Sequence, residues 1–388
     1  MRVEYLEAPL GLDEPVPRMS WAPVESARGA AMASFQIVVK SAGATVWDSG
    51  VVASNSSLNV AYGGPPLTAD TDYTWTLVWT DAQGASAPAS TAPFSTGLLA
   101  RADWRGAAFV MGAPGASNNM LRGEFTIAGT AQVTRARLYI QGLGYYKSWL
   151  NGAPTDAHEL GSFTTFEKRV LYDAWDVAAL LRPGCNALGV MLGAGWYSEP
   201  SVNVGPRSLI AMLSVTQADG TRSYFASAVA PGAGALTFVS TVSPVVSDNI
   251  YAGENYDARL EQPGFAACDF TPPAPWLAAV AAPDPRDVHG AVMSWQSPAS
   301  APAIDRDYSV AAITTPSDGV FVVDFAQNMA GTTTFKVICP AGSQWIYMAY
   351  GESLKPDGTV LNQYGDIMNS NYTCAGTGDV ETYKTHFS

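Results

Sequence analysis

The sequence predicts an all-β protein made of consecutive β-sandwich domains. Among its 388 residues are 36 Gly and 26 Pro together with 11 Trp, 17 Tyr and 14 Phe, a composition typical of chains with many turns and aromatic sheet faces. Several segments carry an apolar residue at every second position, which is the period of a strand with one buried face. Because one domain takes roughly 150 residues, the length corresponds to about two to three domains, and we expect three compact β units.

Charge and hydropathy exclude two classes of function. The chain has 21 Lys and Arg against 34 Asp and Glu, a net charge of −13, and a surface of that sign repels phosphate backbones, which excludes nucleic acid as the main partner. No segment approaches the roughly 20 consecutive apolar residues of a membrane span. The first six residues lack the basic segment and apolar run of a secretory signal, so we expect no export and, by default, a cytoplasmic location.

The first hundred residues predict a small antiparallel sandwich. Phe35, Ile37 and Val39 alternate with their neighbours, and the segment 73–79 repeats this pattern. Turn-forming clusters at 62–66 and 81–84 separate the strands. We expect this unit to end near residue 98.

The middle of the chain predicts a larger sandwich with two hairpins. Asn151-Gly152 follows the apolar segment 145–150 and is a strong signal for a tight turn. A second hairpin is expected around Asp219-Gly220. The one helical candidate is short, from Asp176 as its N-cap to the stop at Pro183-Gly184.

The last part of the chain begins with a Pro-, Ala- and Ser-rich linker at 297–303. Strands are predicted at 320–325, 334–338 and 345–350. Little sequence remains after them, so we expect no helical domain.

Cysteine and histidine spacing predicts no metal or redox site. The four cysteines, Cys185, Cys268, Cys339 and Cys374, show no CxxC spacing, and we expect them to be free structural thiols. The three histidines are far apart in the sequence, which makes a histidine-based metal cluster improbable.

A local group of carboxylates is the strongest chemical signal in the chain. Asp248, Glu254, Asp257 and Glu261 lie within fourteen residues, together with Arg259. A glycosidase needs two carboxyl groups on either side of the scissile bond, and sequence clustering alone does not establish that geometry. The alternative is a polar loop held by an Arg259–carboxylate pair.

The same stretch resembles a family signature. Residues 248–259 are similar to the Asp-x-Ile-Tyr-x-Gly-Glu-x-Tyr-Asp-Ala-Arg motif of bacterial α-L-rhamnosidases, glycoside hydrolase family 78. Other segments agree with that family in the same order, namely 2–6, 9–11, 17–21, 47–50, 168–172, 195–197 and 324–331. The resemblance covers essentially the whole chain.

The resemblance implies a domain order and a function. It implies a fibronectin-III-like sandwich at 1–98, a rhamnosidase N-terminal jelly roll at 99–298 and a concanavalin-like β-sandwich at 299–388, which is followed in family members by a catalytic (α/α)6 barrel that this chain lacks. We therefore expect binding of rhamnose-containing glycans, or a scaffold role beside a separate or downstream barrel, without catalysis. The alternatives are an active glycoside hydrolase that uses Glu254 and Asp257, and a degenerate protein-interaction module.

We expect a sugar site at the rim of the middle domain, after the Asn151-Gly152 turn. The candidate residues are Asn151, Asp156, His158, Glu159, Phe163, Trp196 and Tyr197, with Asp156 as a possible Ca²⁺ ligand. Related rhamnose-binding modules carry Pro-Gly-Trp where this chain ends its loop in Phe163. The structural alternative is that Phe163, Trp196 and Tyr197 only fill space between loops.

The remaining motif residues are expected to support the fold. This set comprises Asp248, Tyr251, Glu254, Tyr256, Asp257, Arg259, Asp324, Gln327 and Asn328. We expect Asp257 and Arg259 to form a buried or semi-buried charge pair. Asp324, Gln327 and Asn328 are expected to satisfy backbone groups in a tight loop, with presentation of the two amides to a sugar as the alternative.

Overall fold

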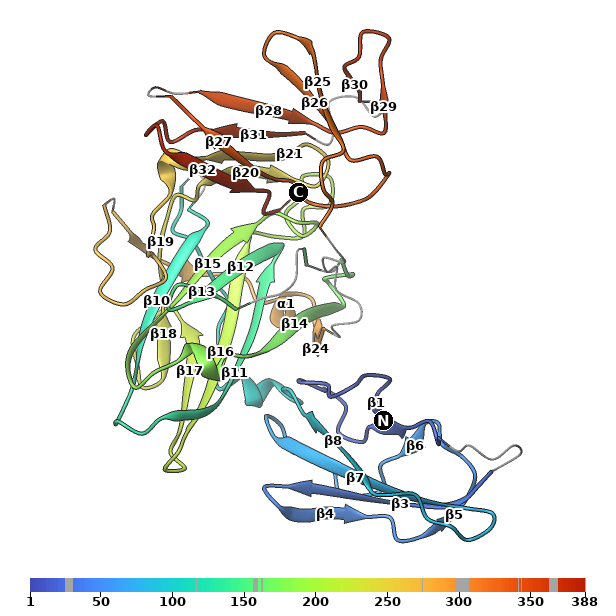
Figure 1. Ribbon diagram of the computed structural model, residues 1–388. Coiled ribbons are helices and arrows are strands. Elements are labelled where there is room, and N and C mark those ends of the chain that lie inside the picture. The colour runs from blue at the N-terminus through green and yellow to red at the C-terminus, as the bar shows by residue number, and fades with distance from the viewer. Residues whose placement is uncertain are drawn as a thin grey trace.

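The computed structural model shows three β bodies, and the chain contributes β20 (Val245–Asn249) and β21 (Gly253–Asp257) to the third before it completes the second (Figure 1). It describes residues 1–24, 31–115, 118–155, 160–161, 163–273, 275–296, 307–340, 342, 344–362 and 369–387. Within these residues the helical structure is α1 (Pro285–Val288) and the 3-10 turns η1 (Arg101–Trp104), η2 (Ala178–Leu180) and η3 (Ala258–Leu260). No helix of the described chain is long and apolar enough to cross a membrane. The predicted all-β fold class is confirmed.

The N-terminal body consists of two sheets. One has the strand order β4-β3-β7-β8, with β5 paired to β3, and the other has the order β1-β2-β6. The strands are β1 (Arg2–Val3), β2 (Arg18–Ser20), β3 (Met32–Ser41), β4 (Ala44–Asp48), β5 (Val52–Ala53), β6 (Val60–Ala61), β7 (Asp72–Asp81) and β8 (Ser90–Ser95). The predicted alternation is confirmed, since Phe35, Ile37 and Val39 are all buried. Ile37 lies opposite the buried Leu77 of β7.

The central body is a sandwich of two large sheets. Their orders are β13-β12-β15-β10-β19-β22 and β18-β17-β16-β11-β14-β24, with β9 and β23 attached to the second. The strands are β9 (Val110–Met111), β10 (Met120–Ile127), β11 (Val133–Leu143), β12 (Tyr145–Leu150), β13 (Ala153–Pro154), β14 (Arg169–Asp176), β15 (Gly184–Gly193), β16 (Ser208–Gln217), β17 (Arg222–Ala228), β18 (Ala235–Thr237), β19 (Val239–Thr241), β22 (Leu277–Ala278), β23 (Val280–Ala281) and β24 (Val292–Trp295). Leu121, Leu188 and Leu213 are among the side chains that fill the core between the sheets.

Local turn chemistry confirms both predicted hairpins. Asn151 and Gly152 have φ angles of 53° and 85°, the left-handed pair that a type I′ turn between β12 and β13 requires. Gly220, with φ 85°, closes the β16–β17 hairpin. The predicted short helix is reduced to η2, where an Asp176 Oδ1 atom accepts from the Ala178 N–H at 3.2 Å.

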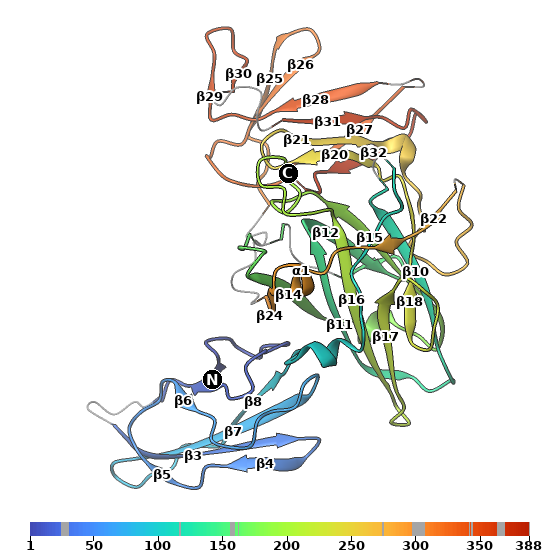
Figure 2. The same cartoon turned by 180° about the vertical axis from the view of Figure 1, so that it is seen from behind.

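The C-terminal body contains one four-stranded sheet, ordered β20-β21-β31-β28, and three two-stranded ribbons. The ribbons β25–β26 and β29–β30 project from the end of the molecule (Figures 1 and 2). The strands are β20 (Val245–Asn249), β21 (Gly253–Asp257), β25 (Ala312–Ser317), β26 (Val320–Asp324), β27 (Thr334–Ile338), β28 (Trp345–Ala349), β29 (Ser353–Leu354), β30 (Val360–Leu361), β31 (Asn369–Thr373) and β32 (Val380–Lys384). The predicted linker at 297–303 lies outside the described residues. Because β20 and β21 come before that segment in the chain, the C-terminal body combines sequence from both sides of it.

A buried carboxylate joins the first two bodies. Asp70, in the loop before β7, accepts hydrogen bonds at 2.8 Å from both Arg135 and Tyr139 and at 2.5 Å from Ser214, all three on strands of the central sandwich. Burial and the negative charge of Asp70 raise the pKa of the Tyr139 hydroxyl. The two bodies therefore meet through this hydrogen-bonded charge contact as well as through a shared apolar cluster that includes Leu98 and Tyr172.

The expectation of free cysteines is wrong. Cys185 is bonded to Cys268 and Cys339 to Cys374, at sequence separations of 83 and 35 residues. The sequence spacing gave no sign of this pairing, because strand pairing brings together cysteines that are distant in the chain. The first disulfide ties the start of β15 to the loop before β22, and the second lies within the C-terminal body.

We expect Cys268→Ser to lower the free energy of unfolding by about 2–4 kcal/mol, because loss of the Cys185–Cys268 crosslink frees a long loop in the unfolded chain. Urea denaturation of the variant and wild type measures the difference, and Cys339→Ser is the matched variant for the second crosslink. Thiol titration of the unreduced, denatured wild type should find no reactive thiol; four reactive thiols would contradict both disulfides.

Candidate functional site

The first half of the family motif anchors a loop of the central sandwich to the C-terminal body. Asp248, on β20, has a fully buried side chain that accepts a hydrogen bond from the Ala194 N–H and pairs with Arg207 at 2.8 Å. Burial raises the pKa of the Asp248 carboxyl, although the Arg207 charge and the Ala194 N–H oppose this effect. This carboxylate therefore fixes both ends of the loop 194–207 against β20.

The next motif residue, Asn249, holds the adjoining turn. Its Oδ1 accepts from the backbone N–H groups of Tyr251 at 2.8 Å and Ala252 at 2.9 Å. Its Nδ2 donates to the carboxylate of Glu199 at 2.5 Å. Glu199, itself buried, belongs to the loop that Asp248 anchors. Neither Asn249 nor Glu199 was predicted as a site residue, and their only sequence signals are their positions inside the motif and just after Gly195-Trp196-Tyr197.

These anchors bring three aromatic side chains from separate segments into one row, which we call the aromatic shelf: Phe163, Trp196 and Tyr251. The ring centroids of Phe163 and Trp196 lie 5.5 Å apart and those of Trp196 and Tyr251 5.6 Å apart, both edge to face. Phe163 is 60% exposed and Tyr251 47% exposed, with Trp196 half-buried between them. Large aromatic side chains usually bury their surface, so an exposed row of three is unusual.

The other predicted sugar-site residues divide into three groups. Tyr197 is buried and packs on Phe166 at 5.1 Å, below the shelf, as the packing alternative predicted. The amide of Asn151 is used within the fold, because its Nδ2 donates to Leu180 and Asn186 and its Oδ1 accepts from the Ala187 N–H. Asp156, His158 and Glu159, together with the Ca²⁺ site expected at Asp156, lie outside the described residues.

Glu254 is the most thoroughly bonded carboxylate of the motif. Its side chain is fully buried and accepts hydrogen bonds from the Tyr383 hydroxyl at 2.8 Å and from the backbone N–H groups of His386 and Phe387 at 3.0 and 2.9 Å. The Nδ1 atom of His386 lies 3.0 Å from the same carboxylate. Tyr256 stacks on the His386 ring, and burial raises the pKa of its hydroxyl. These two residues hold residues 383–387 against β21.

The geometry contradicts Glu254 and Asp257 as a catalytic pair. They are three positions apart on β21, so their side chains point to opposite faces of the sheet. Glu254 faces the core, whereas Asp257 pairs with Arg259 at 2.6 Å on the outer side. Two carboxyl groups on opposite faces cannot flank one glycosidic bond.

The prediction that the Asp257–Arg259 pair is buried or semi-buried is also wrong for the Arg259 guanidinium. Arg259 is 49% exposed in its side chain. The two residues are only two positions apart, and Asp257 Oδ1 also accepts a hydrogen bond from the Arg259 N–H at 3.1 Å. The pair therefore stabilises the local turn η3 and is not part of a network in the core.

The second motif segment lies in an exposed loop after β26. Asp324 Oδ1 accepts from the Ala326 N–H at 2.7 Å, and Ala326 has a φ of 57°, which agrees with the predicted loop-forming role of Asp324. Gln327 and Asn328 are exposed, and the Gln327 amide lies 3.4 Å from the Tyr308 hydroxyl. Presentation of these amides to a ligand stays a prediction.

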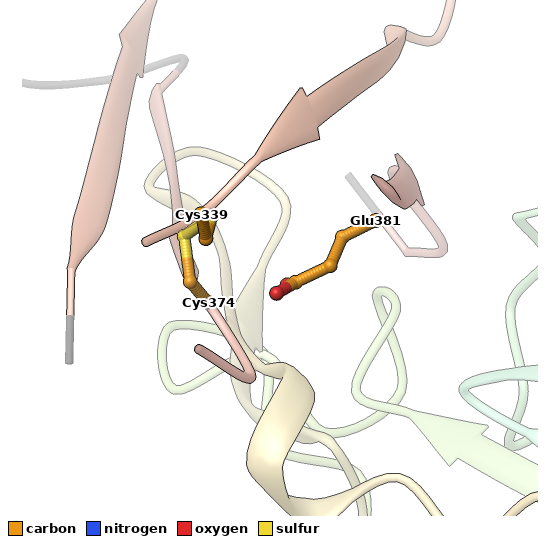
Figure 3. A group of neighbouring side chains, drawn as sticks. All are labelled: Cys339, Cys374 and Glu381. Carbon is orange, nitrogen blue, oxygen red and sulfur yellow. A yellow bond between two sulfur atoms is a disulfide. The ribbon is translucent and has the colours of Figure 1, made fainter. Parts of the chain in front are cut away.

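One group in the described residues has the composition of a metal site, namely Cys339, Cys374 and Glu381 (Figure 3). The two sulfur atoms are bonded to each other. The Glu381 carboxylate accepts from the Tyr372 hydroxyl at 2.6 Å and from the Ala375 and Gly376 N–H groups at 2.9 and 3.1 Å. We therefore assign this group a structural role in the turn after β31.

Comparison with known proteins matches three family domains along the chain. Residues 1–100 match the Rha78A-like N-terminal immunoglobulin domain, residues 131–298 the α-L-rhamnosidase N-terminal domain and residues 314–388 the bacterial α-L-rhamnosidase concanavalin-like domain. The chain belongs to the bacterial α-L-rhamnosidase family. Its predicted membership is confirmed, and the residues that the structure describes contain no helical barrel.

Relatives of this family chain are considerably longer than the chain itself. An α-L-rhamnosidase of Formosa agariphila is 27% identical over 98% of this chain, and one of Streptomyces avermitilis is 34% identical over 70% of it; the matches cover 44% and 26% of those proteins. Among solved structures, the α-L-rhamnosidase from Dictyoglumus thermophilum aligns with a TM-score of 0.89 at 26% identity, over the whole of this chain and 45% of that one. The chain thus spans less than half the length of these relatives.

We expect Asp248→Ala to destabilise this rhamnosidase-family chain by about 3 kcal/mol, because it removes the buried carboxylate and leaves the Arg207 guanidinium, whose side chain is 20% exposed, without its partner. Arg259→Ala, which breaks the exposed pair, should leave the melting temperature close to that of wild type. Thermal unfolding of both variants measures the contrast. Equal melting temperatures for the two variants would show that the Asp248 contact does not anchor the loop.

Asp248 should also give stability a specific pH dependence. Its folded-state pKa is raised, so folding favours the protonated carboxyl, and this contribution is fully present below the unfolded-state pKa and is lost as the pH rises through the folded-state pKa. The melting temperature of wild type relative to Asp248→Asn should therefore fall as the pH rises across this window. A rising or constant difference would contradict the raised pKa.

Proposed function

We propose that this chain is a rhamnose-binding β region of an α-L-rhamnosidase and that the aromatic shelf is its sugar site. The observation that carries the proposal is the exposed row of Phe163, Trp196 and Tyr251, in which anchored loops hold Trp196 and Tyr251. A sugar ring has C–H faces that pack on aromatic rings and hydroxyl groups that need fixed polar partners. The shelf supplies the first of these, beside the hydrogen-bonded turn of Asn249.

Two further observations support rhamnose as the ligand. The relatives are named α-L-rhamnosidases, and an α-L-rhamnosidase of Streptomyces avermitilis with the same fold was solved in complex with L-rhamnose, at 24% identity and a TM-score of 0.88. In a longer protein, the shelf would hold a terminal rhamnose while a catalytic domain acts on a neighbouring bond. Calcium would assist only if the segment 156–159, with its carboxylates, supplies oxygen ligands.

Titration of the chain with L-rhamnose tests the proposal. Ligand-observed NMR and calorimetry at millimolar sugar, with added Ca²⁺ and then with EDTA, should show saturable binding. Phe163→Ala and Tyr251→Ala should each weaken binding by about tenfold, roughly 1.4 kcal/mol, because each removes an exposed stacking surface. Tyr5→Ala is the matched control, since Tyr5 is similarly exposed, at 57%, on the N-terminal body.

Two outcomes would defeat the proposal. One is the absence of any rhamnose response in either buffer. The other is a shelf variant with a lowered melting temperature whose folded fraction binds rhamnose as tightly as wild type, since this is what a purely packing role predicts.

A further inference from the structure

The outer face of the sheet β20-β21-β31-β28 carries a polar row that crosses all four strands. Its members lie opposite one another in register: Ser247 on β20, Asn255 on β21, Asn371 on β31 and Tyr347 on β28. Asn371 Nδ2 donates to Asn255 Oδ1 at 2.7 Å, and Asn255 Nδ2 donates to Ser247 Oγ at 2.7 Å. These side-chain bonds establish that the row lies on one face.

Two exposed aromatic side chains stand at the edge of this face. Trp345 and Tyr347 are two positions apart on β28 and therefore point to the same side; they are 69% and 49% exposed. The opposite side of the same sheet holds the core residues Tyr256 and Tyr372, both buried. Packing in the core therefore explains which residues lie on one face of the sheet. It does not explain why the other face carries a polar row and two exposed aromatic side chains.

We infer that this outer face is a second glycan-binding surface, specific for a neutral oligosaccharide. Sugar rings would pack on Trp345 and Tyr347, and hydroxyl groups along the chain would meet the amides of Asn371 and Asn255. An amide has two N–H donors and an acceptor oxygen, and each of these two amides uses one N–H in the ladder. Because a hydroxyl both donates and accepts, it can satisfy either kind of group.

The width and charge of the face define the ligand further. Four strands at about 4.8 Å spacing span roughly 14 Å, which suits several linked sugars better than a single ring. The charges identified on this side of the sheet, Asp257 and Arg259, pair with each other. With a net charge of −13, the chain disfavours acidic polysaccharides. The row shares no residue with the aromatic shelf, whose Tyr251 lies in the turn between β20 and β21, and the inference does not rest on the proposed function.

Affinity electrophoresis tests this inference on the full chain. The probes are two neutral polysaccharides with rhamnose-free backbones, xylan and a mixed-linkage β-glucan, with polygalacturonate as the acidic comparison, followed by calorimetry with the hexasaccharide of whichever retards the protein. We expect retardation by at least one neutral probe. The double variant Trp345→Ala/Tyr347→Ala should bind at least about tenfold more weakly, and Trp345→Phe, which keeps a stacking surface, should recover part of the loss.

Two control variants show whether binding depends on this face of the sheet. Phe321→Ala removes an aromatic side chain that is 68% exposed on β26, in the separate ribbon β25–β26, and should bind like wild type; Tyr5→Ala on the N-terminal body is the second control and should also bind like wild type. The inference is overturned by retardation on polygalacturonate alone, by no retardation on any neutral probe, or by unchanged affinity in the double variant. Rhamnose binding at the shelf would survive each of these results, so the two sites fail independently.

Discussion

The carboxylate of Asp248 is the contact on which the candidate site depends. It leaves water to meet the Ala194 N–H and the Arg207 guanidinium, and a carboxylate in such a place is tolerated only when charge and hydrogen bonds replace its hydration. The loop between these partners carries Trp196, and the strand that carries Asp248 continues into the turn of Tyr251. One residue further along the chain, the hydrogen bond from Asn249 to Glu199 connects the same strand to the same loop. The shelf therefore exists because two buried polar contacts hold loops from different bodies together.

Buried carboxylates connect separate parts of this protein. Asp70 links the N-terminal body to the central sandwich, Asp248 links that sandwich to the C-terminal body, and Glu254 holds the last described residues against β21. Only 14% of the residues are charged, and these three carboxylates have hydrogen-bond partners in segments far from them in the sequence. Directional hydrogen bonds also fix orientation more closely than apolar contact does.

The pleat of β21 explains how one short motif serves two purposes. Glu254 and Tyr256 point inward and join the core of the C-terminal body, whereas Asn255 and Asp257 point outward. The inward residues account for the structural part of the motif. The outward ones contribute to the polar row beside Trp345 and Tyr347, where the sheet has no described partner. In the sequence, the carboxylates of this stretch resemble a catalytic cluster. On the strand they lie on opposite faces of the sheet and belong to two separate surfaces.

The sequence by itself determined the elements whose cause is local. Alternation predicted β3 and β7 and Asn151-Gly152 predicted its hairpin, because strand period and turn chemistry depend on a few neighbouring residues. The motifs predicted the family because each is a short run of residues and their order along the chain can be compared without a structure. The tertiary structure alone decided which residues meet across long distances. The Cys185–Cys268 disulfide, the Asn249–Glu199 contact and the packing of Trp196 between Phe163 and Tyr251 each join segments tens of residues apart. Burial, too, was decided there: Arg259 is exposed and Glu254 is not, since burial depends on which strands and loops cover a residue.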